Sequence, residues 1–227
     1  MRACAIAFLL ISTALPAQQP RRIALVGGTL IDGNGGRPIR NSVILIDGER
    51  ITAVGTVGAP VPSGYQVIST EGMSVLPGLW DMHVHTMING HGDYAHWDSA
   101  YVNTRSGVLG NVIMPASAKQ LLMAGITSAR DLGAPLDESI ALKNAINSGK
   151  IPGPTIYVSG PFIQHAPYPN TERFRWGVTG ADDARAKVRR LADAGVDVIK
   201  LIDQDEMTMD EVRAVVDEAH RRRLPVV

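Results

Sequence analysis

The hydrophobic pattern of the sequence changes after Pro77, and this change constrains the fold more than any other feature. Up to about Ile68, short apolar stretches are separated by turn residues, which is typical of a β-rich unit. After Pro77, apolar strand-like segments alternate with helix-like segments, and the strands are apolar on both faces. Such strands are typical of a parallel sheet flanked by helices. The pattern therefore predicts an α/β unit that follows a small β unit.

The first unit is expected to be a small β-sandwich over residues 18–76. Its predicted strands are residues 23–26, 42–46 and 50–54. Asp47-Gly48 lies between the last two strands and predicts a hairpin turn, because both turn positions need positive φ. The glycine-rich stretch 27–36 is interpreted as a turn region, since it lacks the Gly-Lys-Ser/Thr ending of a phosphate-binding loop.

The second unit, residues 77–227, is expected to contain four and a half β-α units. The first predicted strand ends at His85, and the others are residues 126–130, 155–159, 196–202 and the start of a fifth at 225–227. Helices are predicted at 106–124, at 137–148, after a capping box of Thr179 and Asp182, and after a second box of Thr208 and Glu211.

A closed barrel of eight β-α units needs about 250 residues, more than follow Pro77. We therefore interpret the second unit as the first half of a (β/α)8 barrel of the TIM type. On this interpretation the chain is the N-terminal part of a larger protein or a truncated gene product.

Residues 1–17 have the pattern of a secretory signal peptide. Arg2 is followed by an apolar stretch and then by small residues suited to cleavage. The apolar stretch is too short to span a membrane, and no later stretch is long enough. The single cysteine, Cys4, lies in this leader, so no disulfide is expected in the mature protein. We expect a secreted or periplasmic protein without an integral membrane span. The formal net charge of 0 gives no reason to expect a nucleic-acid partner.

His83 and His85 come at the end of the first predicted barrel strand and are separated by one residue. Side chains alternate along a strand, so both imidazoles are expected on the same side of the sheet. Imidazole is a common ligand of zinc and related divalent ions. The pair predicts a metal site, and two unrelated surface histidines are the alternative.

Lys200 lies in the fourth predicted strand, on the same face as Val198 and Ile202. Burial disfavours a cation, so the pKa of this lysine is expected to fall. A neutral amine reacts with carbon dioxide to form a carbamate, an anionic oxygen ligand able to bridge two metals. The alternative is an amine that reaches solvent, or that pairs with Asp131 or Asp203.

Three motifs together with the β-rich opening resemble one enzyme superfamily. They are LPGLWDMHVH at residues 76–85, GITSARDLG at 125–133 and GVDVIKL at 195–201. The chain resembles the metal-dependent amidohydrolases, and within them the imidazolonepropionase-like group that includes Xaa-Pro dipeptidases and ochratoxin-type amidases. The resemblance extends over nearly all of the mature chain.

This resemblance implies that His83 and His85 bind the more buried of two zinc ions and that carboxylated Lys200 bridges both. It also implies ligands that this sequence does not contain: a histidine at the end of strand five, another after strand six, and an aspartate after strand eight that acts as proton shuttle. The implied reaction is attack of a metal-bound hydroxide on the amide carbonyl of a small-molecule or dipeptide-like substrate.

Two further residues are weaker candidates for contact with substrate. His165 follows the third strand, where relatives often place a substrate-contacting histidine, and an ordinary loop histidine is the alternative. Arg130 ends the second strand at the rim where barrel enzymes do chemistry, and an ion pair with Asp131 that braces the rim is the alternative.

The leading hypothesis is a secreted, binuclear zinc hydrolase of amide or peptide bonds, present here as an inactive N-terminal portion. The alternative within the superfamily is a one-metal deaminase or cyclic-amide hydrolase, in which Lys200 would be an unmodified amine. An alternative of another class is a non-catalytic barrel scaffold. Half a barrel exposes a strand edge and apolar surface, which favours aggregation or pairing with another chain, including a homo-oligomer.

Overall fold

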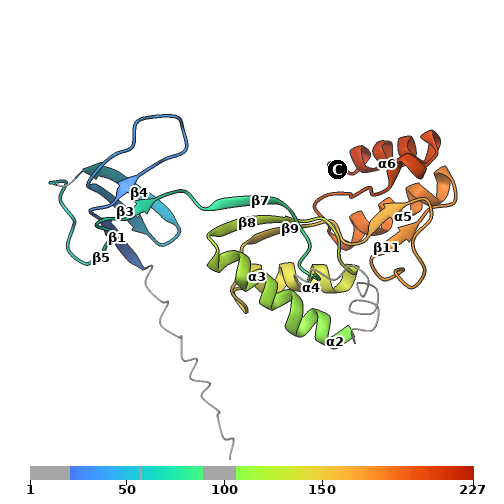
Figure 1. Cartoon of the computed structure of the whole chain (residues 1–227), viewed down its shortest axis with the longest axis horizontal. Helices are drawn as coiled ribbons and strands as arrows, with labels where there is room; N and C mark the ends of the chain where they lie inside the picture. Colours follow the sequence, from blue (N-terminus) through green and yellow to red (C-terminus); the bar gives the residue numbers. More distant parts are fainter. Residues whose placement is uncertain (1–20, 57, 89–105) are drawn as a thin grey trace, which may run out of the picture. The chain divides into compact units, whose positions relative to one another are not determined.

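The computed structural model describes residues 21–56, 58–88 and 106–227 (Figure 1). The predicted leader, residues 1–17, and Cys4 lie outside the described residues. The chain forms two compact units, one up to Pro77 and one from Gly78 to Val227. Each unit has its own sheets and core, and each is described by itself.

The first unit contains a four-stranded sheet with strand order β4-β3-β1-β5 and a separate pair, β2-β6. The strands are β1 (Arg22–Val26), β2 (Thr29–Leu30), β3 (Ser42–Asp47), β4 (Arg50–Thr56), β5 (Gln66–Ser69) and β6 (Ser74–Val75). β3 pairs antiparallel with β1 and β4, whereas β1 and β5 are parallel. Ala24, Val43 and Leu45 form the small core of this unit.

The β3–β4 hairpin forms, but the predicted position of its turn is wrong by one residue. Asp47 pairs with Arg50, so the two-residue loop is Gly48-Glu49 and not Asp47-Gly48. Only the first loop position, Gly48, has a positive φ, of 60°. A glycine is favoured there because it has no Cβ to oppose that conformation, and a hairpin with glycine at the first loop position is a common type.

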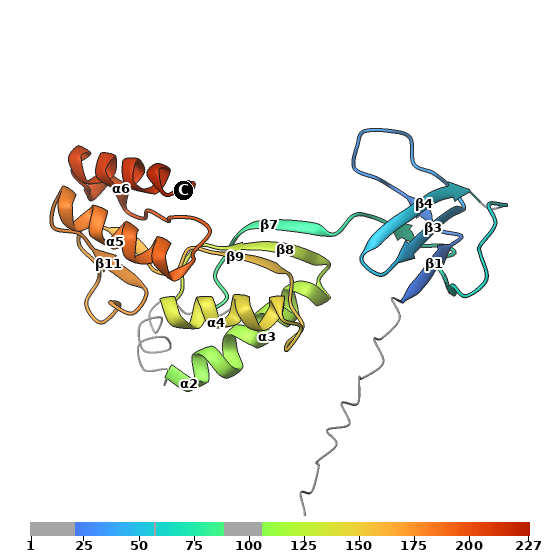
Figure 2. The same ribbon diagram turned by 180° about the vertical axis from the view of Figure 1, so that it is seen from behind.

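The second unit begins with a parallel sheet of strand order β7-β8-β9. The strands are β7 (Leu79–Val84), β8 (Ile126–Asp131) and β9 (Thr155–Val158). Helices α3 (Met114–Met123) and α4 (Leu136–Asn147) lie on one face of this sheet (Figures 1 and 2). Buried side chains from the helices and β9 fill the space between them, including Met114, Ala118, Leu142 and Ile156.

The predicted helix at 106–124 is present but is divided into three parts. α2 (Ser106–Val108) leads into a π-helical segment, η2 (Leu109–Ile113), and then into α3. Pro115 lies in the first turn of α3. Proline has no backbone N–H and its ring crowds the carbonyl four residues earlier, so it disfavours regular α-helical hydrogen bonding in the preceding turn, which is π-helical here.

The first strand of this unit is apolar in sequence, which is typical of a sheet flanked by helices, but most of its apolar side chains are exposed in the structure. In β7 the exposed fractions are 51% for Leu79, 57% for Trp80 and 48% for Met82. Among the described residues β7 pairs only with β8, and α3 and α4 cover only one face of the sheet. Leu79 and Trp80 are adjacent and point to opposite faces, so within the described residues β7 is exposed on both faces at its start.

The predicted fourth strand, residues 196–202, is extended but forms isolated bridges in place of a continuous ladder. The Asp197 N–H donates to the carbonyl of Val158 at 2.8 Å, and Ile163 N–H donates to the carbonyl of Lys200 at 2.8 Å. On its other side, the Ile199 N–H donates to the carbonyl of Pro225 at 2.9 Å. The ladder is interrupted because the segment changes partner from β9 to β10 (Phe162–Gln164), which itself pairs with β11 (Arg175–Gly177).

Asp197 anchors this segment to two other elements. Its carboxylate accepts a hydrogen bond from the Val158 N–H at 2.9 Å and pairs with Lys143 of α4 at 2.6 Å. The two side chains are only 25% and 20% exposed, so the pair is partly shielded from solvent. Lys200, three residues further on, is therefore held on a segment that is tied to both β9 and α4.

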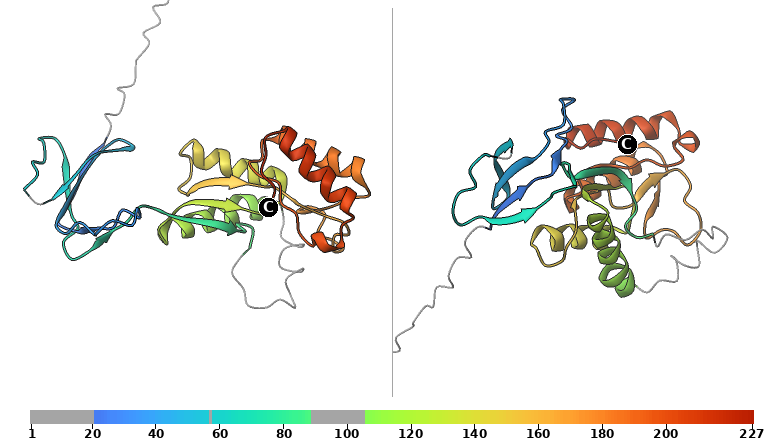
Figure 3. Two further views of the ribbon diagram at one scale, coloured as in Figure 1. Left: turned by 90° about the horizontal axis from the view of Figure 1, so that it is seen from above. Right: turned by 60° about the vertical axis from the view of Figure 1, so that its left-hand side comes forward.

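Helices α5 (Ala181–Ala194) and α6 (Met209–Arg221) lie side by side (Figure 3), and a short 3-10 turn, η3 (Gln204–Glu206), precedes α6. They pack on the extended 196–202 segment. The shared core contains Val188, Leu191, Ile199, Ala214, Val215 and Ala219. None of the helices within the described ranges is both long and apolar enough to cross a bilayer.

One of the two predicted capping boxes is confirmed. At α6, the Thr208 hydroxyl accepts from the Glu211 N–H at 3.2 Å, and the Glu211 carboxylate accepts from the Thr208 N–H at 2.9 Å. At α5 the prediction is wrong, because the helix begins one residue later and Gly180 is its N-cap. Thr179 donates to Asp183 instead, while Asp182 pairs with Arg185 on the helix surface.

Candidate metal centre

The structure brings the rings of His83 and His85 together at the end of β7. Their centroids are 5.2 Å apart and the ring planes cross at 70°. A zinc–nitrogen bond is about 2.0–2.1 Å long, so two rings at this separation can reach one ion between them. His83 is exposed and His85 is partly buried. The pair therefore offers one exposed and one partly buried imidazole.

His85 is held from two sides. Its Nδ1 lies 3.3 Å from the carbonyl oxygen of Gly133, and the Phe162 ring packs edge-on against it with centroids 5.5 Å apart. A carbonyl only accepts hydrogen bonds, so this contact requires the proton on Nδ1 and leaves Nε2 free to bind a metal. Burial lowers the pKa of His85 to about 4, outweighing the contact with Gly133, so the ring is neutral at pH 7.

Lys200 acts electrostatically on both histidines. Its positive charge contributes to the lowered pKa of His83 and of His85, in each case after the larger effect of removing the ring from water. Removal from water, followed by the charge of Arg130, lowers the pKa of Lys200 itself. Among the described residues no carboxylate lies within ion-pair distance of its amine. The three predicted metal ligands therefore share one electrostatic environment.

The residues present fit a metal ion, but they do not complete a site. Neutral imidazoles are the form that binds metal, and a carbamate on Lys200 would add anionic oxygens. A catalytic zinc site usually has three protein ligands. Within the described part of the chain there is no cluster of three or more histidine, cysteine, aspartate or glutamate residues that could hold an ion. Two imidazoles and one lysine are thus the donor set that this structure provides.

Arg130 and Asp131 do not form the ion pair that the sequence suggested as one alternative. Arg130 Nε donates to the carbonyl of Met82 at 2.9 Å, whereas the Asp131 carboxylate accepts from Thr86. Adjacent residues of a strand point to opposite faces, so the two side chains cannot easily meet. Arg130 instead lies near enough to Lys200 and His83 to lower the pKa of both.

His165 lies at the start of α6 and contacts its capping box. Its Nδ1 is 3.1 Å from the Glu211 carboxylate, which also accepts from the Gly180 N–H at 2.8 Å. The His165 side chain is 43% exposed and that of Glu211 only 2%. Burial raises the pKa of Glu211, but hydrogen bonds from Thr208, Gly180 and His165 outweigh this effect and hold the pKa below its usual value. His165 therefore has a structural partner, and its other ring nitrogen is left for further contacts.

Several residues around the site were not anticipated from sequence. Phe162 contacts both His85 and Arg175, whose guanidinium lies 5.1 Å from the ring centroid. Arg175 is 7% exposed, and its charge contributes to lowering the pKa of His85. Neither residue lies in a periodic pattern, so no local signal pointed to them. Asp131 did carry a signal, because an aspartate two residues before a glycine often accepts the N–H of that glycine in a turn.

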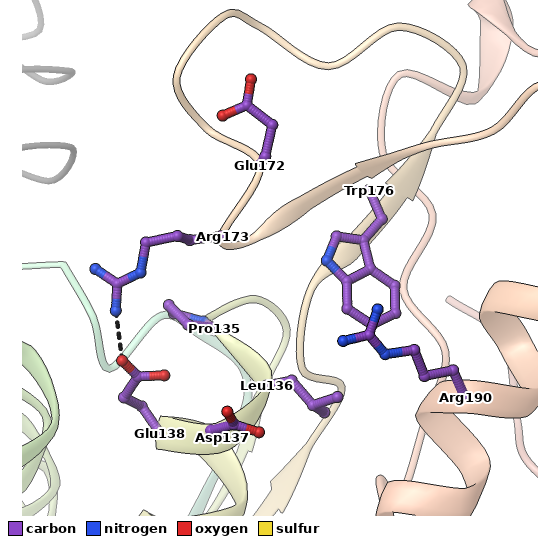
Figure 4. A pocket seen from close by; sticks show the side chains of 8 residues that line it. All are labelled: Pro135, Leu136, Asp137, Glu138, Glu172, Arg173, Trp176 and Arg190. Atoms are coloured by element: carbon purple, nitrogen blue, oxygen red, sulfur yellow. Dashed lines mark hydrogen bonds and ion pairs between the residues drawn. The ribbon is translucent and has the colours of Figure 1, made fainter. Parts of the chain in front are cut away.

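Two cavities of the second unit differ in their chemistry. The larger, of about 390 Å³, is lined by Pro135, Leu136, Asp137, Glu138, Glu172, Arg173, Trp176 and Arg190 (Figure 4). There Arg173 pairs with Glu138, and Arg190 lies 4.6 Å from the centroid of Trp176. The smaller, of about 270 Å³, includes His85 and Thr86 in its wall. None of the three candidate ligands, His83, His85 and Lys200, lines the larger cavity. The smaller cavity, which His85 lines, is therefore the one that borders the candidate metal centre.

A family model of the amidohydrolase family matches residues 74–227, which is more than half of the chain and includes all three candidate ligands. The chain belongs to the amidohydrolase family. Among curated proteins, this amidohydrolase chain is 34% identical over 139 residues to an ochratoxinase of Aspergillus niger, a match that covers 60% of this chain and 27% of the relative. It is also 29% identical over 129 residues to a dihydroorotase of Pelotomaculum thermopropionicum, covering 56% of this chain and 27% of that protein.

A solved structure of a Xaa-Pro dipeptidase with bound methionine in its active site has a similar fold. The TM-score is 0.76 at 27% identity, and the match covers 90% of this chain and 55% of that one. The amidohydrolase chain thus spans about half of this solved relative and about a quarter of the curated ones. Amidohydrolases generally bind metal ions, which agrees with the donor set at the end of β7.

Proposed function

We propose that this chain contributes part of the active site of a metal-dependent hydrolase that cleaves amide or peptide C–N bonds. One observation carries the proposal: in a member of the amidohydrolase family, the paired imidazoles of His83 and His85 share their electrostatic environment with the lowered-pKa amine of Lys200. The similarity in fold to a Xaa-Pro dipeptidase supports a dipeptide-like or other small amide substrate.

The proposed fold of the complete enzyme is a (β/α)8 barrel preceded by a β-sandwich. In it, β7, β8, β9 and residues 196–202 are the first four barrel strands, and residues 225–227 begin the fifth. Parallel pairing and the position of the candidate ligands at the carboxyl end of β7 support this assignment, since barrel enzymes place their chemistry at that end of the strands.

His83, His85 and carboxylated Lys200 are the proposed metal ligands, with zinc as the metal and two ions in the complete site. When bound, zinc makes a hydroxide nucleophile available from water near neutral pH and stabilises the negative charge that develops on the amide oxygen. Two residues of the chain act on the proposed ligands. The Gly133 carbonyl orients His85, and the charge of Arg130 lowers the pKa of Lys200. Arg130 and His165 are proposed to contact the substrate.

Modification of Lys200 follows from its lowered pKa. The neutral amine attacks carbon dioxide, a C–N bond forms, and one proton leaves the nitrogen for solvent, which gives an anionic carbamate. Removal from water and the charge of Arg130 both favour the neutral amine needed for this step. The carbamate would then be a stronger metal ligand than the amine.

The test is a combined measurement of metal and carbamate. Protein equilibrated with ¹³C-labelled bicarbonate and zinc should show a carbamate resonance near Lys200 by NMR and retain zinc after gel filtration. Lys200→Ala should lose both signals, whereas Lys119→Ala, which removes an exposed lysine, should keep them. If Lys200→Ala kept both the carbamate resonance and the zinc, the proposed ligand set would be wrong.

We also propose that the described ligands do not suffice for catalysis without further ones. The match covers 55% of the solved relative and 27% of the curated one, and the described residues hold no cluster of three conventional ligands. Purified residues 18–227 are therefore expected to lack metal-stimulated hydrolysis of a panel of Xaa-Pro dipeptides and N-acyl amino acids. Clear metal-dependent turnover of any of these by this polypeptide would show that the proposal is wrong.

The second candidate is a one-metal deaminase or cyclic-amide hydrolase, and the 29% identity to a dihydroorotase supports only the cyclic-amide substrate class. It differs in metal content, since one ion per active site and an unmodified Lys200 are expected. Two ions per site would favour the first candidate. Failure of a protein that contains the full ligand set to bind metal would favour a non-catalytic scaffold.

We propose that residues 1–17 act as a signal peptide that directs export of the protein. A secreted or periplasmic location is expected, and N-terminal sequencing of the exported protein should show cleavage near Ala14 or Ala17. Recovery of the uncleaved chain from the cytoplasm alone would contradict it.

A further inference from the structure

Asp131 and Thr86 form a buried polar contact directly behind the histidine pair. Both residues are 1% exposed. The Thr86 hydroxyl donates a hydrogen bond to Asp131 Oδ2, and the Gly133 N–H donates to Asp131 Oδ1 at 3.3 Å. The carboxylate thus ties the residue that follows His85 to the turn that ends β8. A buried polar group is retained only where hydrogen bonds replace those with water, so this geometry is strongly determined.

The same turn contacts His85 directly. Gly133, whose N–H binds Asp131, presents its carbonyl oxygen to His85 Nδ1 at 3.3 Å. Its backbone is also held by packing, since a Cβ at position 133 would lie 1.9 Å from a carbon of the Phe162 ring, the ring that packs against His85. The next residue towards β8, Leu132, donates its N–H to the carbonyl of Val84 at 3.0 Å.

We propose that Asp131 is a positioning residue of the metal centre: through Thr86 and Gly133 it fixes the tautomer and orientation of the His85 imidazole, so that Nε2 faces the metal. This inference rests on the proposed function for its metal, but the hydrogen-bond chain belongs to the protein itself. Asp131 touches neither the metal nor the substrate in this scheme. Groups that orient a metal-binding histidine typically change metal affinity by 10- to 100-fold when they are removed.

The alternative is a purely structural role, in which Asp131 joins β7 to β8 and has no effect on the imidazole. The two roles predict different behaviour of His85 in metal-free protein. A positioning role predicts that loss of the carboxylate changes the ratio of the two neutral tautomers. A structural role predicts lower stability with an unchanged tautomer.

The experiment uses the whole chain at pH 8 and compares the wild type with Asp131→Ala, Asp131→Asn and Thr86→Val. Long-range ¹H–¹⁵N NMR of the imidazole nitrogens reports the His85 tautomer in the presence of a chelator. Competition with a chromophoric chelator then measures zinc affinity. Glu211→Gln is the matched control, because Glu211 is also a buried carboxylate that accepts backbone N–H groups, at the starts of α5 and α6 and not at His85.

The wild type is expected to hold the proton on Nδ1 of His85. Asp131→Ala should give a mixture of tautomers and a 10- to 100-fold weaker zinc affinity, Asp131→Asn a smaller loss of affinity, and Glu211→Gln neither effect. If Asp131→Ala does not fold, Thr86→Val carries the comparison, since it removes one of the two contacts and leaves the carboxylate in place.

An unchanged tautomer in folded Asp131→Ala and Thr86→Val overturns the inference, as does an equal loss of zinc affinity in Glu211→Gln. Failure of the wild type to bind zinc, together with a changed tautomer in Asp131→Ala, would support the positioning role and contradict the proposed metal function. The two proposals therefore fail in distinguishable ways.

Discussion

At the scale of single residues, burial changes the protonation of groups around the candidate metal centre. Burial raises the pKa of Asp131 from its ordinary value of 3.8 to about 7, even though hydrogen bonds from Thr86 and Gly133 act in the opposite direction. The same desolvation lowers the pKa of His85. An acid and a base are therefore both shifted towards their neutral forms, because the charged form of each loses contact with water.

Stability should depend on pH through Asp131. The folded protein holds the proton of this carboxyl up to about pH 7, while the unfolded chain loses it near 3.8. The contribution to stability is therefore complete below about pH 4 and is lost as the pH rises through 7. Relative to Asp131→Asn, the wild-type free energy of unfolding should fall over this window by roughly 2–4 kcal/mol.

Urea unfolding of both proteins at several pH values, with a chelator present, measures this difference. Subtraction of the Asp131→Asn series removes the contributions of the other titratable groups. A difference that stays constant between pH 4 and pH 7 would show that the carboxyl is not shifted.

At the scale of elements, helix starts decide how α5 and α6 are anchored. α6 begins with a complete capping box at Thr208 and Glu211, whereas α5 begins at Gly180 without a side-chain cap. The side chain of Glu211 is also shared with His165 and with the Gly180 N–H, so the α6 cap links the starts of both helices. The α6 box therefore stabilises more than its own first turn.

Thr208→Ala should lower the free energy of unfolding by about 1 kcal/mol, within the range of roughly 0.5–2 kcal/mol for loss of a side-chain cap. The matched variant Thr179→Ala should cost less than about 0.5 kcal/mol, because Thr179 makes only an exposed contact with Asp183. Urea unfolding measures both, and Thr208→Ser should restore most of the loss. Equal losses in the two alanine variants would contradict the asymmetry of the two caps.

At the scale of the whole molecule, Trp80 of β7 is 57% exposed in the part of the chain that the structure describes, and it marks an uncovered apolar surface on the second unit. Trp80 stacks on Tyr157 of β9 with ring centroids 5.9 Å apart, so the surface continues across the sheet. Uncovered apolar surface and an unpaired strand edge both favour association with another chain. We expect the purified chain to self-associate through this surface.

Trp80→Thr should weaken self-association by roughly tenfold, since removal of a large aromatic side chain from a contact costs about 1.4 kcal/mol or more. Met123→Gln is the control, because Met123 is 77% exposed at the end of α3 and does not belong to the β7 surface. Light scattering after gel filtration over a range of protein concentrations gives the oligomeric state. A monomer at all concentrations, or an equal effect of both variants, would contradict this expectation.

The sequence by itself determined the features that depend on local spacing. The alternation of strands and helices after Pro77, the α6 capping box and the approach of His83 to His85 all follow from short-range spacing, which is three residues in the capping box and two in the histidine pair. The predicted β3–β4 turn and the predicted start of α5 were each wrong by one residue. In both places a glycine, Gly48 or Gly180, takes the first position of the turn or the N-cap.

Only the tertiary structure decided which distant groups meet. Lys200 acts on the histidines, Asp131 binds Thr86, and His165 binds Glu211, although 46 residues separate the last two. No local period encodes such contacts, because they depend on how strands and helices pack. Burial has the same origin: the apolar sequence of β7 predicted a covered strand, but cover requires a second layer, and a side chain is buried only where another element packs on it.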